Sequence, residues 1–198
     1  MPVHRASLSM AEDNGTPQLR APRTILDMVN YQMHLIESRS ASNVTRMCEG
    51  EFGITRREWR FIAMLAAGGE VAPSELSLRS GLDRSRTSKA LMELLAKGLI
   101  ERRSQAGDRR RATVSLTAEG RSLYELIFPR VVEVNTALLE VLDDTDVAAL
   151  ARILTLLRRR AIEIVNSDLV SASADRRHGG SKRKWKSGKS ARPAPPAG

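Results

Sequence analysis

The sequence predicts a mainly α-helical protein that carries one small β-hairpin. Aromatic residues make up only 4% of the 198 residues, so the core must be aliphatic, and the abundant Leu, Ala, Arg and Glu favour helices. Several apolar segments are preceded by Thr or Asp, which are preferred residues at helix N-termini. The alternation of apolar and polar residues that is typical of a strand is clearest around Val114 and Leu116.

The first third of the chain predicts an arm followed by two helices. Residues 1–22 mix Pro, Ser, Asn and Gly without apolar periodicity, and we interpret them as a flexible arm. A roughly helical pattern covers residues 24–50. Thr55 and Glu58 then have the spacing of a capping box, in which each side chain accepts a hydrogen bond from the backbone N–H of the other residue. They predict a helix that ends at Gly68.

Two more helices are expected in the centre of the chain. Pro73 suits the first turn of a short helix that stops at Gly81. Asp83 is a good N-cap for the next helix, which places leucines on one face and ends at Gly98. The turn between these helices is therefore tight.

A basic hairpin follows. Residues 99–103 and 112–116 predict two strands, and residues 105–108 predict the turn between them. Two short helices, a tight turn and a hairpin are the parts of a winged helix-turn-helix, which we assign to residues 54–117.

The last two helices are predicted over residues 118–165. Thr117 is the N-cap of the first, which Pro129 should kink, and the acidic cluster at Asp143 begins the second. Their apolar stripes are too wide to be buried against one small winged domain. We therefore expect helices 24–50 and 118–165 to form a homodimer, because symmetric dimers are the commonest oligomers. The domain is expected to cover residues 23–166.

Composition argues against several other classes of protein. The sequence has no apolar run long enough to span a membrane, and its start lacks the apolar region of a secretory signal. We expect a cytoplasmic, nucleoid-associated protein without membrane contact. Cys48 is the single cysteine and the three histidines are scattered, so no metal or other cofactor is expected. An enzyme is not expected, since phosphate-loop and catalytic motifs are lacking.

The net charge of +9 is concentrated in two segments. Residues 84–111 carry nine basic and three acidic residues, and residues 166–198 carry eight basic and two acidic ones. The first segment matches a phosphate-binding footprint on double-stranded DNA. The second segment contains residues 167–198, which have too few apolar residues to fold and are interpreted as a basic disordered tail. Its role is either non-specific DNA attachment or solubility.

The helix after Asp83 carries the candidate base-reading residues. In a helix-turn-helix the second helix enters the major groove with its N-terminal residues, where Arg and Lys donate to guanine and Ser or Thr bond to bases or phosphates. The alternative is that these charges only solvate an exposed surface. The candidate DNA contacts here are Arg84, Ser85, Arg86, Thr87, Ser88 and Lys89, with Arg103 on the first strand.

The hairpin tip supplies a second set of candidates, namely Asp108, Arg109, Arg110 and Arg111. An arginine on a projecting hairpin can enter the narrow minor groove of A·T-rich DNA. Asp108 can hold the guanidinium of Arg110 in a fixed pose. The alternative is a surface ion pair that contributes little.

These residues resemble the MarR family of bacterial transcription regulators. The similar segments are 50–60, 74–76, 82–85, 94–102 and 108–120, of which the pattern Asp108-x-Arg110-x-x-x-Val114-x-Leu116-Thr117 is the most specific. The resemblance covers about residues 24–165. It implies a homodimer of winged domains on a pseudo-palindromic operator, with Arg110 in the minor groove, Asp108 as its orienting partner and residues 85–89 in the major groove. The basic tail lies outside the family pattern.

The resemblance also implies two modes of regulation. Many members of the family release DNA when a small aromatic or phenolic acid binds, and Tyr31, His34, Trp59 and Arg60 are the candidate contacts for such an effector. The alternative is that Trp59 and Tyr31 belong to the core and that His34 is an interface residue. Some relatives sense oxidants through a cysteine, for which Cys48 is the single candidate.

The leading hypothesis is a sequence-specific transcription regulator, more specifically a repressor. One alternative is a sequence-tolerant architectural DNA-binding protein, which the basic tail favours. Another is a constitutive activator or anti-repressor that has no ligand. The ratio of specific to non-specific DNA affinity separates the first two.

Overall fold

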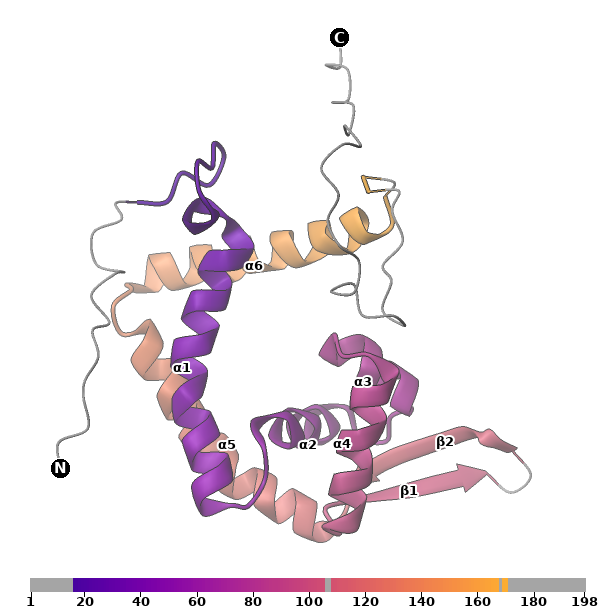
Figure 1. Ribbon diagram of the computed structural model, residues 1–198. Coiled ribbons are helices and arrows are strands. Elements are labelled where there is room, and N and C mark those ends of the chain that lie inside the picture. Colours follow the sequence, from indigo (N-terminus) through magenta and orange to yellow (C-terminus); the bar gives the residue numbers. More distant parts are fainter. Residues whose placement is uncertain (1–15, 106–107, 168, 171–198) are drawn as a thin grey trace, which may run out of the picture. The chain divides into compact units, whose positions relative to one another are not determined.

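The structure is a computed structural model that describes residues 16–105, 108–167 and 169–170, and it leaves the side chains of residues 104–111 undescribed (Figure 1). The predicted arm up to residue 15 and the tail from residue 171 lie outside the described residues. The chain divides into two compact units, residues 1–141 and 142–198, and each is described by itself.

The first unit begins with a short 3-10 helix where the sequence analysis expected the start of one long helix. Residues Ile25–Asp27 form a short 3-10 helix (η1), Met28 is extended, and α1 runs over Val29–Glu51. The helix expected from residue 24 is therefore interrupted. The cause is Asp27, whose carboxylate accepts hydrogen bonds from the backbone N–H groups of Gln18, Arg23 and Thr24, each at 3.0 Å.

The described end of the predicted arm, residues 16–22, is hydrogen-bonded to Asp27 through the backbone of Gln18. The three backbone donors hold the pKa of Asp27 at about 2, because they stabilise its ionised form. Gln18 thus ties the segment before α1 to Asp27.

The next three helices begin and end where their capping residues predict. In α2 (Arg56–Gly68) the Thr55–Glu58 capping box is formed in both directions. Helix α3 (Pro73–Ser80) ends at Gly81, whose φ of 67° lies in the left-handed region that favours glycine. The Asp83 side chain caps α4 (Arg84–Ala96) by accepting from the N–H of Arg86.

Strands β1 (Ile100–Gln105) and β2 (Asp108–Leu116) form an antiparallel hairpin that projects from the helices (Figure 1). Both strands are longer than predicted, and the centre of the predicted turn, residues 106–107, lies outside the described residues. The hairpin is attached to the α2–α3 connection through Val71 and Val114, whose backbones exchange two hydrogen bonds of 3.0 and 2.9 Å.

Helix α5 (Ala118–Leu139) is capped by Thr117 and passes through Pro129. Its first turn lies against the start of the hairpin, since a Cβ on Gly120 would stand 1.9 Å from the carbonyl oxygen of Leu99. In the second unit, α6 (Asp144–Val165) is capped by Asp143 as predicted.

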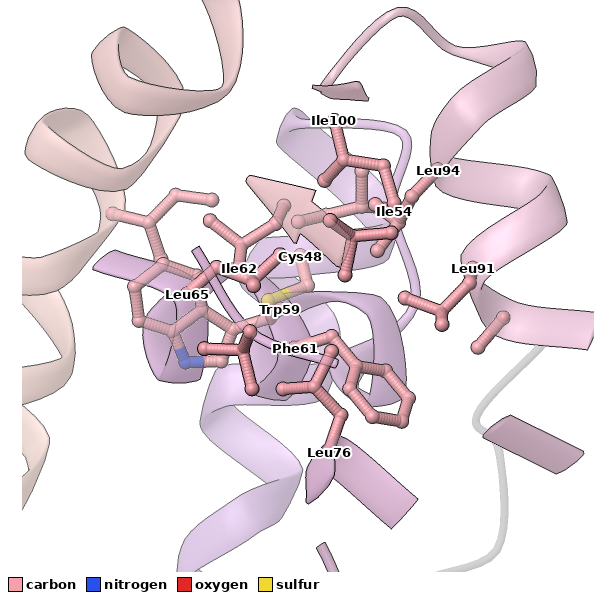
Figure 2. Packing of buried hydrophobic residues seen from close by; sticks show 14 of the residues in the cluster. Cys48, Ile54, Trp59, Phe61, Ile62, Leu65, Leu76, Leu91, Leu94 and Ile100 are labelled. Atoms are coloured by element: carbon pink, nitrogen blue, oxygen red, sulfur yellow. The ribbon is translucent and has the colours of Figure 1, made fainter. Parts of the chain in front are cut away.

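The core of the first unit is aliphatic with two aromatic rings, as the composition indicates. Its buried residues come from α1, α2, α3, α4, the hairpin and α5 (Figure 2). Fully buried side chains include Phe61, Ile62, Leu65, Leu76 and Leu94. This shared core holds α3, α4 and the hairpin on α2, and so fixes which face of α4 is exposed.

Candidate nucleic-acid interface

Helix α4 has one face in the core and the opposite face in solvent. Its buried residues are Thr87, Ala90, Leu91 and Leu94, which recur at helical spacing and pack on the other helices. The residues between them are exposed. These are Arg84, Ser85, Arg86, Ser88, Lys89, Met92 and Glu93.

The N-terminus of α4 is fixed by hydrogen bonds within the helix-turn-helix. Ser77 donates its hydroxyl to the carbonyl of Leu82 at 2.8 Å, which closes the turn between α3 and α4. Asp83 accepts from the N–H of Arg86 at 2.8 Å and also lies 3.4 Å from the Arg86 guanidinium. The exposed cations of the first turn, Arg84 and Arg86, thus stand beside the positive end of the helix dipole. That arrangement favours an anion such as a phosphate.

Thr87 is buried, unlike the other candidate DNA contacts that the sequence analysis placed on this helix. Its side chain is only 1% exposed, and its hydroxyl donates to the carbonyl of Asp83 at 3.0 Å. Thr87 precedes Ala90 by three residues and Leu91 by four, so it lies on the buried face of the helix. Its polar group is satisfied inside α4 and supports the cap instead.

A groove of about 370 Å³ runs beside the exposed face of α4. Its lining combines aliphatic side chains and hydroxyl-bearing side chains, Thr87 among them, with two arginines, Arg84 of α4 and Arg102 of β1. Arg102 pairs with Val114 across the hairpin and follows Ile100 by two residues, so it shares their side of the sheet. Sequence reasoning missed Arg102, although the alternation from Ile100 was a sufficient signal.

Arg103, the residue that the sequence analysis selected, lies on the other side of the hairpin. Its guanidinium is 2.7 Å from the carboxylate of Glu101, which also accepts from the hydroxyl of Ser115 at 3.2 Å. Arg103 is exposed, so a contact with DNA phosphate remains open to it. The structure separates it from the face that carries Arg84 and Arg102.

The candidate DNA contacts at the hairpin tip lie in a segment of which the structure describes only the backbone. The backbone of Asp108, Arg109, Arg110 and Arg111 belongs to β2, with Asp108 opposite Gln105 beyond an irregularity in the register. Their side chains lie outside the described part of the structure. The pairing of Asp108 with Arg110 therefore stays a prediction.

The four candidate effector contacts fall into two different settings. The rings of Tyr31 and His34 are neighbours on α1, with centroids 6.4 Å apart. Trp59 is 6% exposed and lies in the core (Figure 2). Its ring stacks on that of Tyr124, with the centroids 5.7 Å apart. A ligand can therefore reach the ring of Trp59 only by displacing its core neighbours.

Arg60 is exposed, and like His34 it acts electrostatically on Glu37 of α1. Its guanidinium is 3.8 Å from the carboxylate of Glu37, and Arg56 donates to the same oxygen at 2.5 Å. The Arg56 hydrogen bond, together with the charges of Arg56, Arg60 and His34, lowers the pKa of Glu37. Two arginines of α2 thus share one carboxylate of α1, that of Glu37.

Cys48 lies in the core with 0% of its side chain exposed. Burial and the neighbouring Glu49 raise the pKa of its thiol, which disfavours the reactive thiolate. The geometry therefore gives no support to redox sensing through Cys48.

The described residues also include no cluster of three or more His, Cys, Asp or Glu side chains that could hold a metal ion. Within the same residues, none of the helices is both long and apolar enough to cross a membrane.

A winged helix-turn-helix whose second helix exposes a basic face defines a class of DNA-binding proteins. Comparison with known proteins is consistent with that class. The sequence pattern of the MarR family matches residues 52–111. The chain is also 34% identical over 109 residues to the HTH-type transcriptional regulator FarR of Neisseria gonorrhoeae, covering 54% of this chain and 75% of FarR. The chain belongs to the MarR family of transcriptional regulators.

Solved structures share the fold. A MarR/EmrR family transcriptional regulator from Acinetobacter sp. ADP1 superposes with a TM-score of 0.63 and 25% identity over 68% of this chain and 94% of that one. The C80S mutant of MarR from E. coli, complexed with operator DNA, has a TM-score of 0.58 and 21% identity over 65% and 92% of the two chains. The expected winged helix fold is therefore confirmed.

Proposed function

We propose that this protein is a sequence-specific repressor that binds a pseudo-palindromic operator as a homodimer. The observation that carries the proposal is the exposed face of α4. Arg84, Ser85, Ser88 and Lys89 are exposed, while Leu91 and Leu94 of the same helix are buried. A helix that exposes polar residues on one face and buries leucines on another fits the major groove. Its exposed donors can reach base edges while its buried face stays in the core.

Phosphate contacts would orient the helix. Arg86 stands at the N-terminus of α4, and Arg102 lines the groove beside it. Contacts of this kind supply much of the affinity but read no sequence directly. We assign base reading to Ser85, Ser88 and Lys89, and minor-groove contact at the hairpin tip to Arg110 oriented by Asp108. A protein of the same fold, the C80S mutant of E. coli MarR, was solved in complex with operator DNA, which supports operator binding by this fold.

The proposed homodimer is supported by apolar side chains that the chain does not bury by itself. Large hydrophobic residues are exposed on all three helices assigned to the dimer interface. They include Met33 and Ile36 on α1, Phe128, Val132 and Leu138 on α5, and Ile153, Leu156, Leu157 and Ile164 on α6. Exposed apolar side chains that gather on one surface are typical of protein–protein interfaces. The proposed functional domain is residues 23–166.

The proposed effector is a small aromatic or phenolic acid. His34 and Arg60 both act electrostatically on Glu37, and the ring of Tyr31 is a neighbour of His34. An aromatic acid would therefore compete with Glu37 for Arg60 while its ring packs on Tyr31. Such a ligand releases DNA only if it binds more tightly to the dimer geometry that does not fit the operator. It need not touch DNA.

Selection of bound fragments from random DNA with the purified full-length protein tests the proposal. Recovery of two inverted half-sites, about one helical turn apart, is expected for a dimer. Specific affinity should exceed non-specific affinity by about a thousandfold or more at physiological salt. Fragments without a common sequence would instead favour the architectural DNA binder, and failure to retain any fragment would contradict DNA binding itself.

A further inference from the structure

One large apolar side chain lies on the DNA-facing surface of α4. Met92 is 66% exposed, although its neighbours Leu91 and Leu94 are 5% and 0% exposed in the core. It follows Ser85 by seven residues and Lys89 by three, so the three residues lie along one strip of the helix. The exposed strip of α4 is thus not entirely polar.

The direction of helical side chains brings Met92 toward the residues proposed to read bases. Cα–Cβ bonds tilt toward the N-terminus of a helix, so a long side chain covers the preceding turn. That turn holds Ser88 and Lys89. Met92 also lines the groove beside α4 together with Arg84 and Ser88, which places it on the same side as both.

We propose that Met92 determines sequence specificity by contacting the C5-methyl group of a thymine in each half-site. This inference rests on the proposed binding of α4 in the major groove. A thioether cannot donate a hydrogen bond to a phosphate or to guanine, so apolar contact is the favourable interaction that DNA offers it. In the major groove the methyl group of thymine is the apolar feature of the base edges. Cytosine at the same position lacks it.

The chemistry also predicts the size of the effect. Removing one methyl group from water changes affinity by about fourfold. A dimer makes the contact twice, so the loss of both methyl groups should weaken binding by about fifteenfold. Changes of this size are easily measured, and they are small enough to leave the complex intact.

Substitution of deoxyuridine for thymidine removes only the methyl group and leaves base pairing unchanged. The experiment uses the full-length protein and the operator recovered by selection. Symmetric thymine pairs are replaced one pair at a time, and affinity is measured for the wild type, Met92→Ala, Met92→Leu and Leu78→Ala. Leu78 is a matched control, because it is 82% exposed on α3 and lies outside α4. Thermal unfolding of each variant checks that it is folded.

We expect one thymine pair at which deoxyuridine weakens wild-type binding by about fifteenfold. Met92→Ala should lose that sensitivity, while Met92→Leu and Leu78→Ala keep it. The inference is overturned if no position responds to loss of the methyl group, or if Met92→Ala responds as the wild type does. Failure of the proposed function would be recognised earlier, since the wild-type protein would then yield no operator.

Discussion

The ammonium group of Lys97, at the end of α4, lies 2.7 Å from the carboxylate of Glu58 in the first turn of α2. Glu58 is only 1% exposed, and the same ammonium donates to the carbonyl of Gly53 at 2.9 Å. One side chain therefore holds α4 against both the start of α2 and the loop before it. The position of α4 depends on a charge as well as on the apolar core.

Replacement of Lys97 by Met should destabilise the fold by about 2 kcal/mol at neutral pH. It leaves a buried carboxylate without its cation, and the usual cost of 3–5 kcal/mol is reduced here because Lys97 itself is partly exposed. Urea denaturation followed by circular dichroism measures the change. Arg57→Met, on the exposed side of α2, is a control that should change stability little.

The stability difference between wild type and Lys97→Met should depend on pH. Burial alone would raise the pKa of Glu58, but hydrogen bonds from Lys97 and Thr55 outweigh it and lower the pKa below 4.5. In the wild type this stabilisation is present above pH 4.5 and is lost as the pH falls through the lowered value. In Lys97→Met the pKa of Glu58 should be raised, because burial then acts without the ammonium. The stability difference between the two proteins should therefore become smaller as the pH falls. A difference that grows on acidification would contradict the role of Glu58.

Thr87 and Ser88 are adjacent, and they should respond oppositely to substitution. Thr87→Val removes a buried hydrogen bond to Asp83 and should cost about 1 kcal/mol of stability without changing the preferred operator. Ser88→Ala should leave stability unchanged and weaken operator binding, because Ser88 is exposed on α4 and is proposed to contact bases. Denaturation and operator titration of both variants separate the roles. Altered base preference in Thr87→Val would reverse the assignment.

The sequence predicted those features that depend on residues close together in the chain. The caps at Thr55, Asp83, Thr117 and Asp143 are formed as expected, since a cap requires only a side chain and the next helical turn. The hairpin and the core leucines of α4 were predicted for the same reason, because each follows from a local repeat.

The errors have different physical causes. The interruption before α1 arises because Asp27 captures the backbone of Gln18, nine residues earlier, which no periodicity reveals. Thr87 was included among the candidate contacts, and Arg102 was left out, because residue type was given more weight than position on the helix or strand. Their spacing from Leu91 and from Ile100 already indicated the correct faces.

Lys89 and Arg110 should contribute to different parts of the operator. Lys89→Ala should weaken binding most when the centre of each half-site is intact, because its exposed ammonium is placed to donate to base edges. Arg110→Ala should weaken binding most on A·T-rich flanks, where the minor groove is narrow. Affinities for operators altered at the centre or at the flank test both expectations. Equal losses on every sequence would show that both residues contact only phosphate.

Leu157→Glu should dissociate the proposed homodimer. Leu157 is 40% exposed on α6, and it lies on a stripe with Leu150, Leu154 and Ala161 at spacings of three and four residues. A carboxylate buried there without a partner would cost about 3 kcal/mol or more, which corresponds to at least a hundredfold in the dimer dissociation constant.

Thr155→Glu is the matched control for Leu157→Glu. It adds the same charge to α6, but Thr155 lies away from the apolar stripe and donates its hydroxyl to the carbonyl of Ala151. Sedimentation should show a dimer for the wild type and for Thr155→Glu, and a monomer for Leu157→Glu. The monomer should also bind a single half-site only weakly, because the second set of phosphate contacts is lost. A Leu157→Glu protein that sediments as a dimer would remove α6 from the interface.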